Sequence, residues 1–262
     1  MYIDTHAHLT DSKFNDIKRV VEEYQQDKVD KVITMACNVN DAKNCISLAE
    51  KYESVYFGAG IHPQDAKQVS DSDLEEILSF AKHEKCVCIG EIGLDYYWDK
   101  TYNDIQKEVL IKQLEIAKQL KLPVSFHSRE ATEDTLVLLK QNKNLLEYGG
   151  VLHCYSGSRE TAKEILDLGL KLGFGGTLTF KNSKKVKEVF NYVPIDTVVT
   201  ETDCPYLSPE PFRGKINTPK NIPIIVEFMA KEKNMQVEEL AKIIYKNTSE
   251  LFAFKNAKQS QK

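Results

Sequence analysis

Two histidines separated by one residue, His6 and His8, end the first apolar run of the chain. Alternate residues of a strand face the same side, so both imidazoles project together, with Cα atoms roughly 6 to 7 Å apart. Both rings can then approach one ion to the roughly 2.0 to 2.1 Å that zinc requires. Asp4 falls on the same face, where we expect it to orient a ring from behind. Such pairs also occur by chance, so the metal prediction depends on partners elsewhere.

Five of the six histidines stand at or just beyond the end of a predicted strand, and only His83 lies elsewhere. They are His6, His8, His62, His127 and His153. Glu91 closes the fourth predicted strand and Asp203 follows the eighth. In a parallel barrel the carboxyl ends of all strands converge on one face, so these residues are predicted to meet.

Four of these histidines and the two carboxylates outnumber the three protein ligands of a single open catalytic zinc site. They predict two divalent ions, Mg²⁺, Mn²⁺ or Zn²⁺, bridged by one carboxylate. Imidazole favours zinc or manganese over magnesium, which prefers oxygen, so the metal stays open. His62, which precedes Pro63, is expected either to bind substrate or to be structural.

Arginine is rare, with four copies against 31 lysines. Arg129, Arg159 and Arg213 follow the fifth, sixth and eighth predicted strands. The planar guanidinium matches phosphate or carboxylate in a bidentate way, so all three are candidate substrate-binding residues for an anionic substrate. Tyr96, Tyr97 and Trp98 follow Glu91, and they either stack unpaired bases or pack their loop against the barrel.

Eight short apolar runs, separated by segments of helical periodicity, must position these side chains. The runs are Tyr2 to His8, Lys31 to Cys37, Val55 to Ile61, Cys86 to Glu91, Pro123 to His127, Gly150 to Cys154, Lys171 to Leu178 and Thr197 to Thr202. The alternation predicts βαβ units with a parallel sheet. Eight strands in 262 residues favour a single-domain (β/α)8 TIM barrel over an open doubly wound sheet.

Two of the intervening segments give specific helix predictions. Apolar residues from Ile105 to Leu120 recur at spacings of three and four, which indicates an amphipathic helix before the fifth strand. After the sixth strand, Ser158 is the expected N-cap and Gly169 the expected left-handed C-terminal residue of another helix.

Composition predicts one barrel domain over residues 1–255 and a polar tail over 256–262 that frays. The formal charge of −4 argues against a generally basic protein that coats nucleic acid. Six cysteines without a Cys-x-x-Cys motif favour reduced thiols and a cytoplasmic location. No leader or run of 18 apolar residues is seen, so we expect no membrane association.

The chain resembles the TatD family of metal-dependent deoxyribonucleases along nearly its whole length. Seven ordered motifs carry the resemblance: Ile3-Asp4-Thr5-His6-Ala7-His8, Gly60-Ile61-His62-Pro63, Gly90-Glu91-Ile92-Gly93-Leu94-Asp95-Tyr96, His127-Ser128-Arg129-Glu130-Ala131, His153-Cys154-Tyr155-Ser156-Gly157-Ser158, Glu201-Thr202-Asp203-Cys204-Pro205-Tyr206-Leu207 and Arg213-Gly214-Lys215. Ile216 and Thr218 depart from the Arg and Glu that many members carry, which puts the substrate contacts of that loop in doubt.

The resemblance implies a TIM barrel with a two-metal site. His6, His8 and Asp203 would hold one ion, His127 and His153 the other, and Glu91 would bridge them. It also implies a magnesium-dependent nuclease, expected to trim single-stranded DNA or a DNA end in the 3′-to-5′ direction.

The leading hypothesis is hydrolysis of a DNA phosphodiester bond by water activated between two metals, with Asp203 and Glu91 as catalytic residues. The alternative is a carbonyl substrate, such as a D-aminoacyl-tRNA ester or a small amide or lactone. A third possibility is a barrel that binds metal or a partner without catalysis. The oligomeric state stays open.

Overall fold

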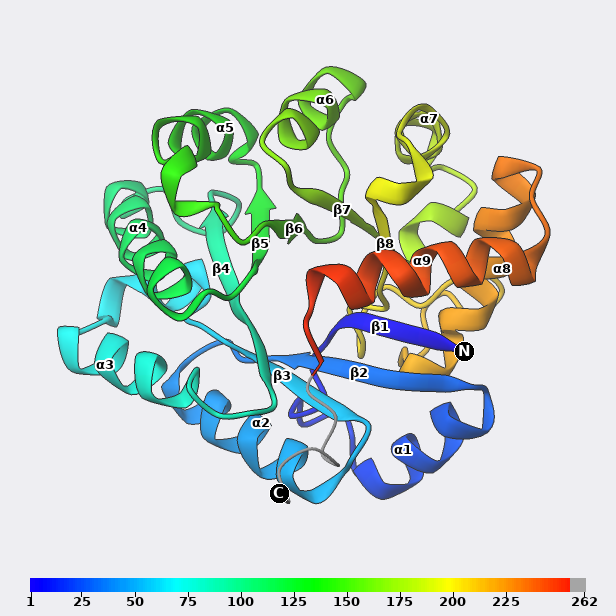
Figure 1. Ribbon diagram of the computed structural model, residues 1–262, viewed down its shortest axis with the longest axis horizontal. Coiled ribbons are helices and arrows are strands. Elements are labelled where there is room, and N and C mark those ends of the chain that lie inside the picture. The colour runs from blue at the N-terminus through cyan, green and yellow to red at the C-terminus, as the bar shows by residue number, and fades with distance from the viewer. Residues whose placement is uncertain (255–262) are drawn as a thin grey trace.

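Eight parallel strands follow one another around the molecule in chain order, each paired with the next (Figure 1). The computed structural model describes residues 1–254. The strands are β1 (Tyr2–Ala7), β2 (Val29–Met35), β3 (Val55–Ala59), β4 (Cys86–Asp95), β5 (Val124–Arg129), β6 (Gly150–Leu152), β7 (Lys171–Phe174) and β8 (Val198–Thr200). The predicted (β/α)8 barrel is confirmed.

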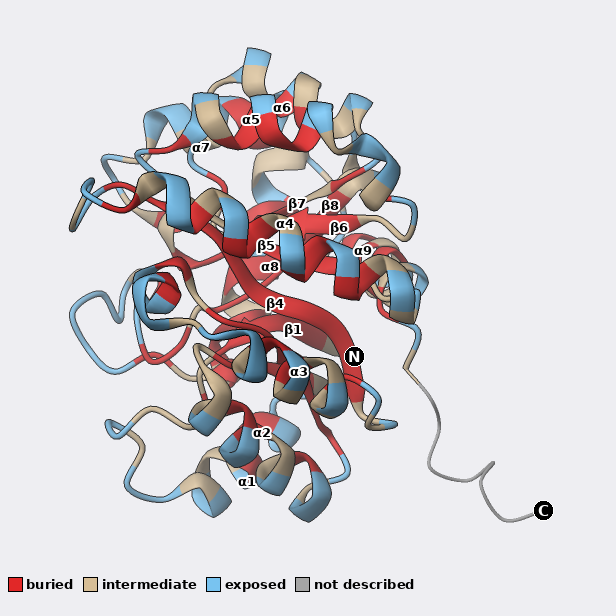
Figure 2. Ribbon diagram, turned by 90° about the vertical axis from the view of Figure 1, so that its left-hand side faces the viewer, coloured by how far each residue is buried: buried red, intermediate tan, exposed pale blue. Residues whose placement is uncertain are grey.

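Helices surround the strands and turn their buried faces inward (Figure 2). They are α1 (Ile17–Gln26), α2 (Val39–Lys51), α3 (Asp71–Phe80), α4 (Asn103–Leu120), α5 (Thr132–Gln141), α6 (Arg159–Asp167), α7 (Lys184–Tyr192), α8 (Ile222–Lys233) and α9 (Val237–Leu251). Short 3-10 turns are η1 (Pro63–Gln68), η2 (Lys143–Leu145), η3 (Gly176–Thr179), η4 (Ile195–Thr197) and η5 (Pro219–Asn221). Both predicted helices are present as α4 and α6, and α6 has a capping box at Ser158.

The strand predictions are right in number and differ at their ends. The fourth strand does not end at Glu91 but continues to Asp95, so Glu91 lies inside it. The seventh ends at Phe174 rather than Leu178, because the chain turns into η3 at Gly176. A Cβ on Gly176 would lie 2.0 Å from the carbonyl oxygen of Leu207, so only glycine allows this close approach.

The far end of the barrel is filled by the segment after α9. Phe252 is fully buried and clusters with inward-facing residues of several strands, including Ile33, Val151 and Val199. This apolar filling leaves the polar residues to the opposite end. The predicted tail over 256–262 lies outside the described residues. Within the described chain, no helix is both long and apolar enough to cross a membrane.

Between β1 and the segment that contains β8, backbone pairing is limited to an isolated bridge between Ala7 and Cys204. Side-chain hydrogen bonds join the two segments instead, and they involve Asp4, Thr5 and Thr202. Thr5 donates its hydroxyl to the carbonyl of Thr200 at 3.0 Å. The Asp4 carboxylate accepts from the backbone N–H of Thr202 at 3.0 Å and from the Thr202 hydroxyl.

The prediction that Asp4 orients a histidine ring is wrong. Its carboxylate accepts from the backbone N–H groups of His6 and Thr202 and from the Thr202 hydroxyl. It therefore fixes the backbone that carries His6 and Asp203. Burial raises the pKa of Asp4 to about 7, against the hydrogen bonds that lower it.

Replacing Thr202 with Val should destabilise the fold, because the buried Asp4 carboxylate loses a hydroxyl donor. We expect the free energy of unfolding to fall by about 1 to 3 kcal/mol in urea denaturation. Thr132→Val, on the exposed start of α5, serves as control and should change it by less than about 0.5 kcal/mol. Equal stability of both variants would contradict this role of Asp4 and Thr202.

Candidate metal centre

A cavity of about 900 Å³ opens at the carboxyl ends of the strands. Its lining includes Glu91 and His127, which lie within β4 and β5, and residues that follow β1, β3, β6 and β8: His8, His62, His153 and Asp203. The strand-end histidines and carboxylates of the sequence therefore meet in one place, with His6 buried directly behind them.

The Glu91 carboxylate lies at the centre of the site and is 3% exposed. Five imidazoles lie within ion-pair distance of it: His127 at 2.7 Å, His153 at 2.8 Å, His6 at 3.2 Å, His8 at 3.5 Å and His62 at 3.7 Å. The pairing of β4 with β5 shifts register between Ile89 and Ile92. Such bulges re-aim side chains, and this one contains Glu91.

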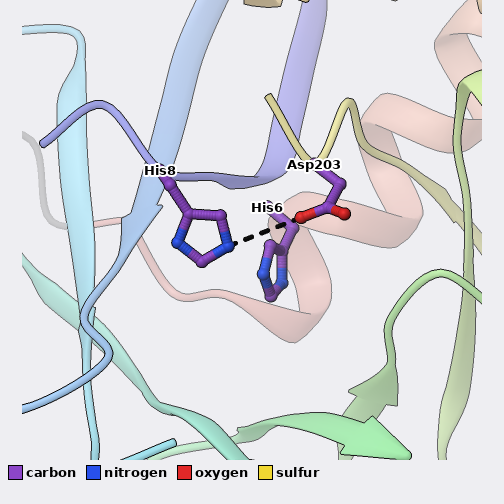
Figure 3. Close-up of side chains that lie close together, drawn as sticks. All are labelled: His6, His8 and Asp203. Carbon is purple, nitrogen blue, oxygen red and sulfur yellow. Dashed lines mark ion pairs between the residues drawn. The ribbon is translucent and has the colours of Figure 1, made fainter. Parts of the chain in front are cut away.

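Two clusters of potential ligands share this centre. One is His6, His8 and Asp203, and the other is Glu91, His127 and His153; within each, the ligand atoms lie within 4.8 Å of one another. Figure 3 shows the first cluster, with the Nε2 of His8 facing Asp203 Oδ1 at 3.4 Å. The backbone N–H of Asp203 donates to the His6 carbonyl at 2.9 Å, which fixes this arrangement.

In both His8 and His127, one ring nitrogen is held by an acceptor behind the ring, and the other nitrogen faces the carboxylates of the site. His8 donates through Nδ1 to the carbonyl of Met35 at 3.3 Å, so its Nε2, which faces Asp203, is the nitrogen that would bind a metal. His127 donates through Nε2 to Asp95 at 3.1 Å, which leaves Nδ1 facing Glu91. Metal-binding histidines are commonly held in this way by a carbonyl or carboxylate on the other ring nitrogen.

His62 has the opposite arrangement. Its Nδ1 accepts the backbone N–H of Gln64 at 3.2 Å, so the proton of the neutral ring is on Nε2. Burial is the main cause that lowers the pKa of His62 to about 4, so the ring is neutral near pH 7. Its Nε2 is therefore a hydrogen-bond donor toward the cavity rather than a metal ligand, although His62, Asp95 and His127 lie close enough to form a cluster.

His153 faces Glu91 with Nε2 and Glu201 with Nδ1. The Nδ1 to Glu201 Oε1 distance is 3.9 Å, and His153 Nδ1 and Glu201 Oε2 are both buried without a hydrogen-bond partner. Glu201 accepts the backbone N–H of Cys154, and burial raises its pKa to about 8. It lies behind His153 without a hydrogen bond to the ring, whereas Asp95 hydrogen-bonds His127.

Charge within the cavity favours bound cations. Six of the lining residues are carboxylates: Asp11, Asp41, Asp65, Glu91, Asp95 and Asp203. Burial opposes ionisation of Glu91, but the surrounding histidines hold its pKa well below its usual value. Burial and the charge of His153 lower the pKa of His6 to about 4, and these two rings stack at 3.9 Å. Imidazoles around ionised carboxylates are the donor set of a transition-metal site, so the residues fit divalent ions.

Asp95 and Glu201 are the residues that sequence reasoning missed, although both stand in its motifs. Asp95 follows Glu91 by four positions, so it shares that face of β4. Gly93, between them, has φ of +154°, and a Cβ there would lie 1.9 Å from the His127 carbonyl oxygen. The even spacing of Glu91 and Asp95 in an otherwise apolar strand is the sequence signal that indicates Asp95 as a site residue.

The three predicted arginines do not lie together. Arg129 lines the cavity, whereas Arg159 and Arg213 are absent from the part of its lining that the structure describes. Arg159, at the start of α6, lies over the ring of Tyr192, and Arg213 lies over Phe180 at 4.2 Å. Ile216, in the loop that departs from the family pattern, is 54% exposed.

Comparisons with known proteins agree with this architecture. A family model described as TatD related DNase matches residues 3–253. YabD of Bacillus subtilis, named an uncharacterized metal-dependent hydrolase, is 42% identical over 96% of this chain and 99% of its own length. YcfH of Escherichia coli K12, named likewise, is 36% identical over 95% of both chains. The crystal structure of YjjV, a TatD homolog from Escherichia coli K12, matches with a TM-score of 0.91 and 31% identity, over 96% of this chain and 98% of that one.

Histidines assigned as metal ligands, such as His127, and His62, assigned as a hydrogen-bond donor, should differ in their effect on metal affinity. We expect His127→Gln to weaken Mn²⁺ or Zn²⁺ affinity by at least about tenfold, since loss of even an outer partner typically costs 10- to 100-fold. His62→Gln should leave affinity unchanged. Equilibrium dialysis with elemental analysis measures both, and His83→Gln, outside the cavity beside Glu50, is the control. Equal metal loss in His62→Gln would contradict the assigned proton position.

Proposed function

The chain belongs to the family of TatD-related DNases and is a metal-dependent hydrolase, and from this we propose that its substrate is a phosphodiester bond of DNA. The expected reaction is 3′-to-5′ removal of nucleotides from a single strand or a DNA end. The six free cysteines agree with the proposed cytoplasmic location.

The position of Arg129 in the cavity is the observation that favours a phosphate ester as substrate. It is the one lysine or arginine among the described residues that line the cavity. Within residues 1–254 its guanidinium lies against aromatic rings and forms no ion pair with a carboxylate. Its N–H groups therefore remain available to an anion, and their fork matches two phosphoryl oxygens.

The proposed centre holds two divalent ions. His6, His8 and Asp203 would hold one, His127 and His153 the other, and Glu91 would bridge. Bound ions would neutralise charge on the phosphoryl oxygens and lower the pKa of a water toward neutrality. Asp95 would keep His127 oriented from behind through its hydrogen bond, and Glu201 lies near the Nδ1 of His153.

The protein's own groups complete the reaction. Burial opposes the charge on Asp203, but its hydrogen bond with His8 and the nearby histidines lower its pKa, so it is ionised at neutral pH. Asp203 then accepts the proton of the attacking water as general base. His62 donates its Nε2–H to a non-bridging oxygen, and Arg129 stabilises the charge that develops there.

Replacing Asp203 with Asn should remove hydrolysis without unfolding the barrel. Loss of a general base should lower kcat by about 10²- to 10⁴-fold. The substrate is single-stranded DNA labelled at the 3′ or the 5′ end, incubated with metal-stripped protein reconstituted separately with Mg²⁺, Mn²⁺ and Zn²⁺. The two labels report the direction of cleavage, and unfolding in urea checks the fold.

Asp104→Asn is the control for this experiment, because Asp104 is an exposed carboxylate on the first turn of α4. Full activity of Asp203→Asn would contradict the role of Asp203. Absence of cleavage by the unaltered protein with every metal would contradict the DNA assignment, and would favour a carbonyl substrate such as a D-aminoacyl-tRNA ester.

Arg129→Gln should lower kcat/KM for the same strand by about 10²- to 10³-fold, the usual effect of losing one donor to a developing anion. Arg159→Gln is the matched control, since Arg159 likewise lies over an aromatic ring but outside the described cavity lining. Equal activity of both variants would show that Arg129 does not bind the phosphate.

A further inference from the structure

Trp98 is a large apolar side chain that the fold leaves uncovered. It is the only tryptophan of the chain, stands in the loop between β4 and α4, and is 64% exposed. It lines the same cavity as Glu91, His127 and Arg129. The aromatic residues of this loop are expected either to stack unpaired bases or to pack against the barrel. Tyr96, which is 8% exposed, packs against the barrel, whereas Trp98 does not.

The neighbours of Trp98 fix the loop at the cavity rim. The Tyr96 hydroxyl donates to Asp134 at 2.8 Å, and the Tyr97 N–H donates to Asp95 at 2.9 Å. Asp95 is the carboxylate that holds His127. Only Tyr96 and Tyr97 separate Trp98 from Asp95, so their Cα atoms are at most about 10 to 11 Å apart. The indole is therefore held close to Asp95, the residue that hydrogen-bonds His127 in the metal centre.

Aromatic and cationic groups lie together at this rim. The rings of Tyr97 and Trp98 meet edge to face with centroids 4.8 Å apart. The Arg129 guanidinium lies 3.8 Å from the Tyr97 centroid and 5.6 Å from that of Trp98. A phosphate-binding cation thus lies beside an exposed aromatic plane, and a nucleotide offers the two matching groups, a phosphate and a flat base.

We propose that Trp98, supported by Tyr97 and Arg129, is a stacking site for one unpaired nucleobase of the strand whose phosphate enters the metal centre. The inference rests on the proposed phosphodiester function and makes it specific to single-stranded DNA or a frayed end. A base inside a duplex is already stacked on its neighbours, so its face is not available to Trp98. The site recognises the π-face common to all bases and therefore has little sequence preference.

Fluorescence of the single tryptophan tests this directly, because no other indole contributes. The metal-loaded protein is titrated with a short thymidine strand whose phosphorothioate linkages resist hydrolysis, and with an abasic strand of equal length. Stacking should quench Trp98 with the thymidine strand and not with the abasic strand. An equal response to both strands would overturn the proposal, because only the sugar-phosphate backbone is common to them.

A second measurement compares Trp98→Ala, Trp98→Phe and a control by fluorescence anisotropy of labelled thymidine strand. Trp98→Ala should weaken binding by about tenfold, within the range of one stacked base, and Trp98→Phe should restore most of it. The control is Tyr192→Ala, since Tyr192 is 49% exposed and also lies near an arginine, Arg159, but outside the described cavity lining. Unchanged binding in Trp98→Ala would overturn the stacking site.

Cleavage of an unmodified strand and of a small phosphodiester without a base separates this inference from the proposed function. Trp98→Ala should raise KM for the strand and leave turnover of the small ester unchanged. Base-dependent quenching without any cleavage would support stacking and overturn the proposed reaction. Cleavage of both substrates, unaffected by Trp98→Ala, would support the reaction and overturn stacking.

Discussion

The contact between one buried carboxylate and five imidazoles is the interaction on which this molecule is organised. Glu91 lies within 4 Å of five of the six histidines, and these come from four strands or the segments directly after them. A buried carboxylate is costly unless positive charge is supplied. Burial opposes the charge on His127 and His153, but the neighbouring carboxylates raise the pKa of both rings. Divalent cations would supply the same positive charge in place of those protons, so the electrostatics of the barrel interior favour bound metal.

A second set of contacts fixes the orientation of the metal-binding side chains. The Met35 carbonyl and Asp95 accept from His8 and His127 and so set which nitrogen faces the metal. The Asp4 carboxylate joins β1 to the segment that carries Asp203, where the backbone pairing alone is short. The same reasoning distinguishes His62, whose partner is a donor, from the metal ligands.

Much of the architecture was predictable because the strand pattern of a parallel barrel is local. Eight apolar runs were identified, and the six expected metal ligands do converge in the structure. The errors occurred where tertiary contacts override local pattern. The fourth strand continues past Glu91 through a bulge, Asp4 binds backbone instead of a ring, and the three candidate arginines diverge because helix and loop positions decide where each side chain points.

The sequence by itself determined the fold class and the chemical types at the strand ends, because alternation and strand spacing are properties of neighbouring residues. The tertiary structure alone decided which nitrogen of each histidine is free, since that depends on partners such as Asp95 and the Gln64 N–H. It also decided which aromatic residues between β4 and α4 are buried. Tyr96 is buried and donates to Asp134, while Trp98 stays exposed and lines the cavity. Burial and hydrogen bonding depend on residues distant in the chain, so no local pattern contains them.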